Sequence, residues 1–141
     1  MIEFSIPGKP MGKERPRFAR SGAVYTPTKT KEMEMLIAAY YRAAGGKNLG
    51  AVPVGIVIEM VYGISKRGTK EELAKIRAGK RVPMSKPDCD NCAKLVCDAL
   101  NGVAYDDDRQ ITQIGVFKRY CRENEQPHVE VRVWASESQP C

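Results

Sequence analysis

The sequence predicts a small α/β protein, of the α+β kind, with a mixed β-sheet of about four strands and helices packed on it. Two observations lead to this prediction. Four segments alternate apolar and polar residues or run through β-branched residues, as strands do. Three other segments repeat apolar residues at helical spacing and lie between the strands. At 141 residues, the chain is expected to form one domain, residues 1–141.

A first strand is predicted over residues 2–7, where apolar and polar side chains alternate. The next stretch, GKPMGKERPRFARSGAVYTP, is interrupted by Pro and Gly and is too irregular for a helix. It predicts a basic loop. Beside a metal site, the loop residues Lys13, Arg15 and Arg17 would hold a phosphate backbone.

The middle of the chain predicts two helices and one strand. Residues 28–44 carry apolar side chains at helical spacing, and we expect them to pack in the core. Residues 52–62 have apolar side chains on both faces, which is typical of a central strand. Residues 65–86 are polar and basic, with a short helix over 69–78, and indicate a flap rather than a chemical site.

Residues 89–100 predict an amphipathic helix that Asn101-Gly102 ends. Asp88 is a candidate for the N-cap. Asp90, Lys94 and Asp98 share the polar face. The apolar stripe consists of Cys92, Leu95, Val96, Ala99 and Leu100.

Two further strands are predicted over residues 111–120 and 128–134. Lys118 and Arg119 on the first would extend a basic surface. His128 has no acidic or cysteine partner nearby in the sequence, so we expect a histidine on the strand surface.

Acidic residues gather between residues 86 and 110, although the chain as a whole is basic. The chain has 23 Lys and Arg against 17 Asp and Glu, a net charge of +6. Helix-dipole and i,i+4 contacts each contribute only about 0.2–1 kcal/mol, too little to explain this cluster. Its six members are Asp88, Asp90, Asp98, Asp106, Asp107 and Asp108.

Three of these acids form a candidate metal site. If the strand from Ile111 lies beside the helix start, Asp108 would meet Asp88 and Asp90. Carboxylates without His or paired Cys favour Mg²⁺ or Mn²⁺, which activate water and polarise phosphoryl oxygens. Lys94, one turn on, would stabilise charge developing on phosphorus or orient the water.

Two alternatives remain open. The acids could merely cap a helix and solvate a turn, which would leave a non-catalytic nucleic-acid-binding module. Cys89-x-x-Cys92 with Cys97 could instead indicate a zinc- or thiol-based regulator. A structural zinc normally needs four ligands, however, and Cys121, Cys141 and His128 are scattered along the sequence.

Composition limits the partners. The positive charge favours a polyanion, with nucleic acid first. No apolar run approaches the roughly 20 residues of a membrane span. The start MIEFSIPGKP has an early acid and no signal-peptide apolar region, so we expect a cytoplasmic protein.

The stretches PDCDN-x-x-K-x-x-x-DALNG and YDDDRQI resemble the signature of the RusA endonucleases, the Holliday junction resolvases common in phages and prophages. The N-terminal PG-x-P-x-x-K-x-RPR and YTP stretches are also similar to phage members. The departures are mild: cysteines stand at 89, 92 and 97, where relatives often have apolar residues, and Asp106 is an additional acid.

The resemblance implies a Mg²⁺- or Mn²⁺-dependent homodimer that cuts four-way DNA junctions by paired nicks in recombination and repair. It implies catalytic acids at Asp88, Asp90 and Asp108 and an essential lysine at Lys94. A two-fold dimer would suit a junction of near two-fold symmetry.

Overall fold

A computed structural model describes residues 1–14, 17–25, 27–65 and 67–136. Its main sheet has the strand order β1-β6-β4-β5, formed by β1 (Ile2–Pro7), β4 (Val54–Tyr62), β5 (Ile111–Tyr120) and β6 (His128–Ala135). β4 pairs in parallel with β5 and antiparallel with β6, and β1 pairs antiparallel with β6. The predicted four-stranded mixed sheet is therefore confirmed, and β4 is an interior strand as expected.

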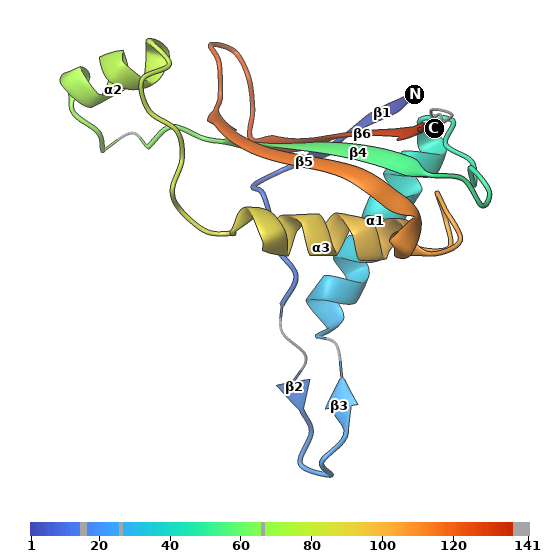
Figure 1. Cartoon of the computed structure of the whole chain (residues 1–141). Coiled ribbons are helices and arrows are strands. Elements are labelled where there is room, and N and C mark those ends of the chain that lie inside the picture. Colours follow the sequence, from blue (N-terminus) through green and yellow to red (C-terminus); the bar gives the residue numbers. More distant parts are fainter. Residues whose placement is uncertain (15–16, 26, 66, 137–141) are drawn as a thin grey trace.

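One face of this sheet carries the core. The two helices α1 (Thr28–Ala43) and α3 (Cys89–Leu100) cover it, as Figure 1 shows. Alternate residues of β4 point into this layer and are fully buried, because the helices exclude water from that face. The buried side chains of the sheet are Phe4, Ile6, Val54, Ile56, Ile58, Met60, Tyr62, Val129, Val131 and Val133.

α3 was predicted with its observed bounds, and its apolar stripe is buried against the sheet and α1. Burying five such side chains holds the helix rigidly, at roughly 1.5–3 kcal/mol for each large aliphatic residue. The opposite face of α3, which carries Asp90 and Lys94, is therefore presented to solvent on a fixed support.

The N-terminal basic loop contains an element that the sequence did not predict. Two-residue strands, β2 (Arg17–Phe18) and β3 (Val24–Tyr25), pair antiparallel and form a hairpin that extends away from the sheet. Strands of two residues are too short to show the alternation of apolar and polar residues from which a strand is predicted. The loop before the hairpin runs along α3, where Lys13 N–H donates to the carbonyl of Asn91 at 3.1 Å.

The predicted short helix is present as α2 (Lys70–Arg77) and lies beyond the end of the sheet (Figure 1). None of its residues is buried. Thr69 caps it by accepting a hydrogen bond from Glu72 N–H at 3.1 Å. No helix among the described residues is both long and apolar enough to cross a bilayer.

Candidate functional site

Asp88 and Asp90 project from the start of α3, and both are exposed. Asp88 occupies the N-cap position, as predicted, but its side chain makes no capping hydrogen bond. Within the described chain, neither carboxylate forms an ion pair with Lys or Arg. Helix capping therefore does not account for Asp88, which leaves its carboxylate oxygens available to a ligand.

The three consecutive aspartates have different surroundings. Asp106 accepts a hydrogen bond from Asn48 Nδ2 at 3.2 Å. Asp107 caps the 3₁₀ turn η1 (Asp108–Gln110), and Gln110 completes a capping box with it. The hydrogen bond from Arg109 N–H lowers the pKa of Asp107. Asp108 is exposed and pairs with no cation of the described residues, so it is the member that no structural contact explains.

The geometry places Asp88 and Asp108 toward opposite ends of α3. At one end, Tyr62 Oη donates to the carbonyl of Pro87 at 3.1 Å. Burial is the main cause that raises the pKa of Tyr62 to about 12, and the nearby negative charge of Asp88 adds to it. Asp88 therefore lies at the end of the sheet where β4 finishes.

Asp108 lies near the other end of the helix, as its effect on Cys97 indicates. Burial, followed by the charges of Asp98 and Asp108, raises the pKa of Cys97 to about 11. The condition under which Asp108 would meet Asp88 and Asp90, that β5 begins beside the helix start, is not met: Figure 1 shows β5 beginning beside the helix end. The physical reason is the compact turn after α3, which returns Tyr105 to donate to the Cys97 carbonyl at 2.6 Å.

The residues fit a hard divalent ion by their chemistry, since Asp88, Asp90 and Asp108 are exposed carboxylates without cation partners in the part of the chain that the structure describes. Their ligand atoms do not all lie within 4.8 Å of one another. In the described part of the chain, only Glu125, His128 and Glu130 form a group of three that close. Binding of one ion by the three aspartates stays a prediction, and it requires the exposed turn carrying Asp108 to approach the helix start.

The two lysines near this face differ in their contacts. Lys94 is exposed and forms none of the described ion pairs, including with Asp90 and Asp98 four residues away. Lys13 instead contacts Asp98, and its ammonium lies 3.7 Å from Glu34. The hydrogen bond to Asp98 raises the pKa of Lys13. Lys94 is therefore the cation left available to a substrate.

Close packing fixes Lys13 in this position. A Cβ built on the neighbouring Gly12 would lie 2.8 Å from Pro87 Cβ and 3.0 Å from Asn91 Cβ. The loop can run this close to the start of α3 only because residue 12 lacks a side chain. Sequence reasoning missed this contact, although a glycine directly before Lys13 was visible.

The other predicted DNA-binding residues are dispersed. Arg17 is exposed and lies 3.4 Å from Glu14, while Arg15 falls outside the described residues. Lys118 donates to the Ser85 carbonyl at 2.7 Å and stands 5.3 Å from the centre of the Tyr62 ring. Through this hydrogen bond, Lys118 links β5 to the segment that leads into α3.

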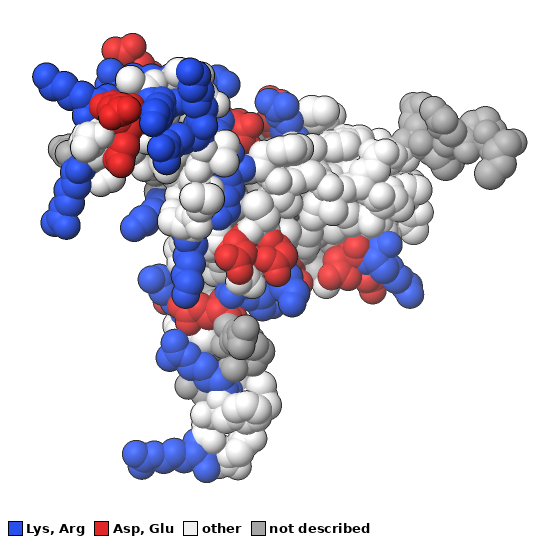
Figure 2. Space-filling view, turned by 60° about the vertical axis from the view of Figure 1, so that its left-hand side comes forward, with Lys and Arg blue, Asp and Glu red and all other residues white. Residues whose placement is uncertain are grey.

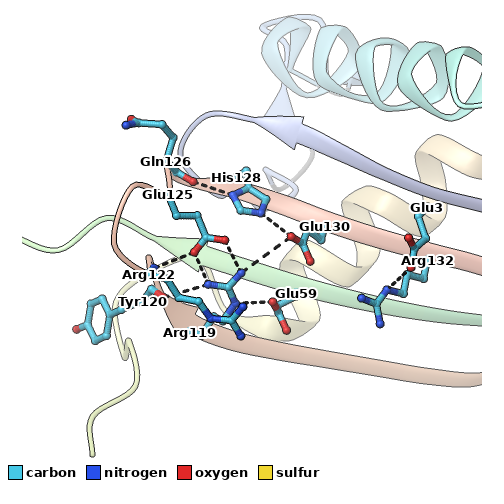
Figure 3. A network of polar contacts seen from close by, with 10 residues as sticks. All are labelled: Glu3, Glu59, Arg119, Tyr120, Arg122, Glu125, Gln126, His128, Glu130 and Arg132. Carbon is cyan, nitrogen blue, oxygen red and sulfur yellow. Dashed lines mark hydrogen bonds and ion pairs between the residues drawn. The ribbon is translucent and has the colours of Figure 1, made fainter. Parts of the chain in front are cut away.

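A second charged cluster lies on the sheet face that the helices leave open (Figure 3). Arg119 Nη1 lies 2.5 Å from Glu125 and its Nε 2.5 Å from Glu59. The hydrogen bond from Arg119 lowers the pKa of Glu125 to about 2. Arg119 therefore belongs to an ion-pair network and does not extend a free basic surface, contrary to the sequence-based expectation.

His128 also differs from its prediction, because Nε2 contacts Glu130 at 2.9 Å and Nδ1 contacts the Gln126 carbonyl at 2.7 Å. Burial alone would lower the pKa of His128, but these two contacts raise it overall. Strand alternation, which puts residues 128 and 130 on one face, was the signal for this pair. With a guanidinium already among the acids, a metal ion would have to displace Arg119.

The cysteines offer no zinc site among the described residues. Cys89, Cys92, Cys97 and Cys121 are free thiols, and none belongs to a group with metal-ligand spacing. Cys92 is buried in the core, and this burial raises its pKa to about 12, which keeps the thiol protonated. Cys141 lies outside the described residues.

Comparison with known proteins gives two matches. The family model described as endodeoxyribonuclease RusA matches residues 7–134. The uncharacterized protein YqaN of Bacillus subtilis (strain 168) is 32% identical over 137 residues, which cover 94% of this chain and 94% of the relative.

Proposed function

The chain belongs to the RusA family of endodeoxyribonucleases, and from this premise we propose that it is a metal-dependent nuclease that resolves four-way DNA junctions by paired phosphodiester hydrolysis. The observation that carries the proposal is the set of acids without a structural task. Asp88, Asp90 and Asp108 stand exposed in a basic protein, without cation partners among the described residues. Carboxylate oxygens without another partner are available as ligands of a hard divalent ion.

Each residue of the site has a proposed task. Asp88, Asp90 and Asp108 would hold Mg²⁺ or Mn²⁺, which when bound supplies an activated water and a positive charge beside the phosphate. Lys94 would donate its ammonium protons to a phosphate oxygen and so stabilise the charge that develops during hydrolysis. The buried stripe of α3 keeps Asp90 and Lys94 in fixed relation, one helical turn apart.

DNA would be held by basic residues around this face. Arg17, on the hairpin, and Arg15 are proposed backbone contacts. Lys13 would act mainly by holding the loop against Asp98, given its ion pairs. Lys118 would contact DNA only if it left the Ser85 carbonyl.

We further propose that the working form is a homodimer acting in recombination and repair. Two copies related by a two-fold axis would present equivalent sites to two strands of one junction. Paired nicks need such an arrangement, because the described chain carries one set of these acids.

The test is cleavage of a synthetic four-way junction and a linear duplex, each with Mg²⁺ and with a chelator. We expect junction cleavage only with the ion. Asp90→Asn should abolish cleavage and keep junction binding. The control Asp106→Asn changes an aspartate two residues before Asp108 and should leave cleavage unchanged. Cleavage by Asp90→Asn at the unaltered rate, or equal cleavage with a chelator, would overturn this assignment of the site. Junction binding without cleavage, with or without the ion, would favour the non-catalytic binding module.

A further inference from the structure

The excess positive charge of the molecule is concentrated in one segment, residues 63–86, which we name the α2 arm. It carries eight Lys and Arg and two Glu, a net charge of 8 − 2 = +6, equal to the net charge of the whole chain. The remainder is therefore neutral. Lys66 lies outside the described residues, so the described part of the arm carries +5.

Local stability does not account for these charges. α2 has no buried residue, and within the arm the described ion pairs include only Lys75–Glu71 at 3.8 Å. A pair of this kind contributes about 0.3–0.5 kcal/mol. The remaining described cations of the arm form none of the described ion pairs, which favours an external anion as their counterpart.

The arm forms one wall of a cleft. A hollow of about 710 Å³ lies between the arm and the β5–β6 turn, and four arginines line it: Arg77, Arg81, Arg119 and Arg122. A neighbouring hollow of about 560 Å³ shares Ile76, Tyr120 and Pro127 with it, so the two form one groove. Figure 2 shows Lys and Arg side chains gathered over the part of the surface where α2 lies.

Three of these arginines are available to a ligand. Arg119 is engaged by Glu59 and Glu125. Arg77, Arg81 and Arg122 are exposed, and the described ion pairs involve none of them. Guanidinium groups bind phosphate oxygens in a bidentate manner, and this set would suit successive phosphates of a nucleic-acid backbone.

The base of the arm is joined to the start of α3. Lys118 Nζ donates a hydrogen bond to the Ser85 carbonyl. Tyr62 Oη donates to the carbonyl of Pro87, the residue before Asp88. A backbone seated along the groove would therefore lead to the end of α3 that carries Asp88 and Asp90.

We propose that the groove under the α2 arm binds the phosphate backbone of one duplex arm of the DNA substrate through Arg77, Arg81 and Arg122. This inference rests on the proposed nuclease function for the identity of the nucleic acid. It assigns a binding surface to a segment that the sequence indicated only as a flap.

The test measures binding without cleavage, in the Asp90→Asn background, to a fluorescent four-way junction and to a linear duplex of one arm's sequence. The arm variant carries Arg77→Gln, Arg81→Gln and Arg122→Gln. The control carries Lys29→Gln, Lys31→Gln and Arg42→Gln, which remove the same charge from exposed positions of α1.

Loss of three phosphate contacts should reduce the slope of log K against log salt by about 2.7, since each contributes roughly 0.9. Between about 50 and 200 mM salt, the parent should then lose about 40-fold more affinity than the arm variant. At the lower salt the arm variant should bind more weakly than the control, and both should keep the parent's melting temperature.

Equal slopes and equal affinities for the arm variant and the control would overturn the inference. Junction cleavage by the chain with Asp90 intact is measured in parallel. If that chain cleaves while the arm variant binds normally, the arm inference fails alone. If it does not cleave but the arm variant loses binding, the nuclease proposal fails and the DNA-binding groove stands.

Discussion

At the scale of single residues, Arg119 holds together the charges on the open face of the sheet. Its side chain is 19% exposed and contacts Glu59 and Glu125, with Glu130 at 4.0 Å. Partial burial makes these contacts stronger than ordinary surface pairs. If the arginine were lost, Glu59 and Glu125 would lose their ion-pair partner, and Glu130 would keep only His128.

We therefore expect Arg119→Met to lower the free energy of unfolding by about 2–4 kcal/mol, measured by urea denaturation. The control is Arg132→Met on the same face, which removes a pair whose side chains are 52% and 61% exposed. That change should cost less than about 1 kcal/mol. Equal effects of the two substitutions would contradict the assigned role of Arg119.

His128 makes the stability of this face depend on pH. Its folded pKa is raised by Gln126 and Glu130, so the protonated form is favoured by folding. The stabilisation is fully present below the unfolded pKa of about 6.5 and is lost as pH rises through the raised folded value.

The measurement is the difference in free energy of unfolding between the natural chain and His128→Gln, from about pH 6 to about pH 9. The natural chain's advantage should shrink as pH rises. An advantage that is constant, or that grows with pH, would show that the imidazole is not held in its protonated form.

At the scale of elements, the contact between the N-terminal loop and α3 links the basic segment to the candidate site. Gly12→Ala would force its Cβ to within 2.8 Å of Pro87, so the loop must lift from the start of the helix. The ion pair of Lys13 with Asp98 would be displaced with it.

We expect Gly12→Ala to reduce junction cleavage at least about tenfold, because small misplacements near a site are costly. The melting temperature should change little, since the loop lies outside the core. Ser21→Ala, at an exposed position of the hairpin turn, is the control and should keep full activity. If Gly12→Ala left the cleavage rate unchanged or raised it, the N-terminal loop would have no role in positioning the site.

Helices and strands whose apolar residues repeat at a regular spacing could be predicted from the sequence, whereas the contacts between side chains could not. The bounds of α3 and β5 were predicted as observed. For α3, the apolar spacing indicated the buried face, and the Asp88 N-cap and Asn101-Gly102 indicated the two ends. The β2–β3 hairpin and the capping of η1 by Asp107 depend on local hydrogen bonds that no period signals. The ion pairs of Lys13 and Arg119 depend on residues 85 and 60 positions away along the chain.

At the scale of the whole molecule, charge is separated into regions. The α2 arm carries the net positive charge, and the surface around α3 and η1 carries acids without cation partners among the described residues. A neutral remainder forms the sheet and the core. This separation would let a polyanion be held at one place while a divalent cation is held beside it.

The central claim is that acids from the two ends of α3 bind one ion, although the described structure does not bring all of their ligand atoms within 4.8 Å of one another. Calorimetric titration with Mn²⁺ of the natural chain, Asp90→Asn, Asp108→Asn and the double variant tests it most directly. For a shared ion, each single substitution should weaken binding at least about tenfold, and the double variant should show strong non-additivity. Purely additive losses, or unchanged binding in either single variant, would contradict a shared ion.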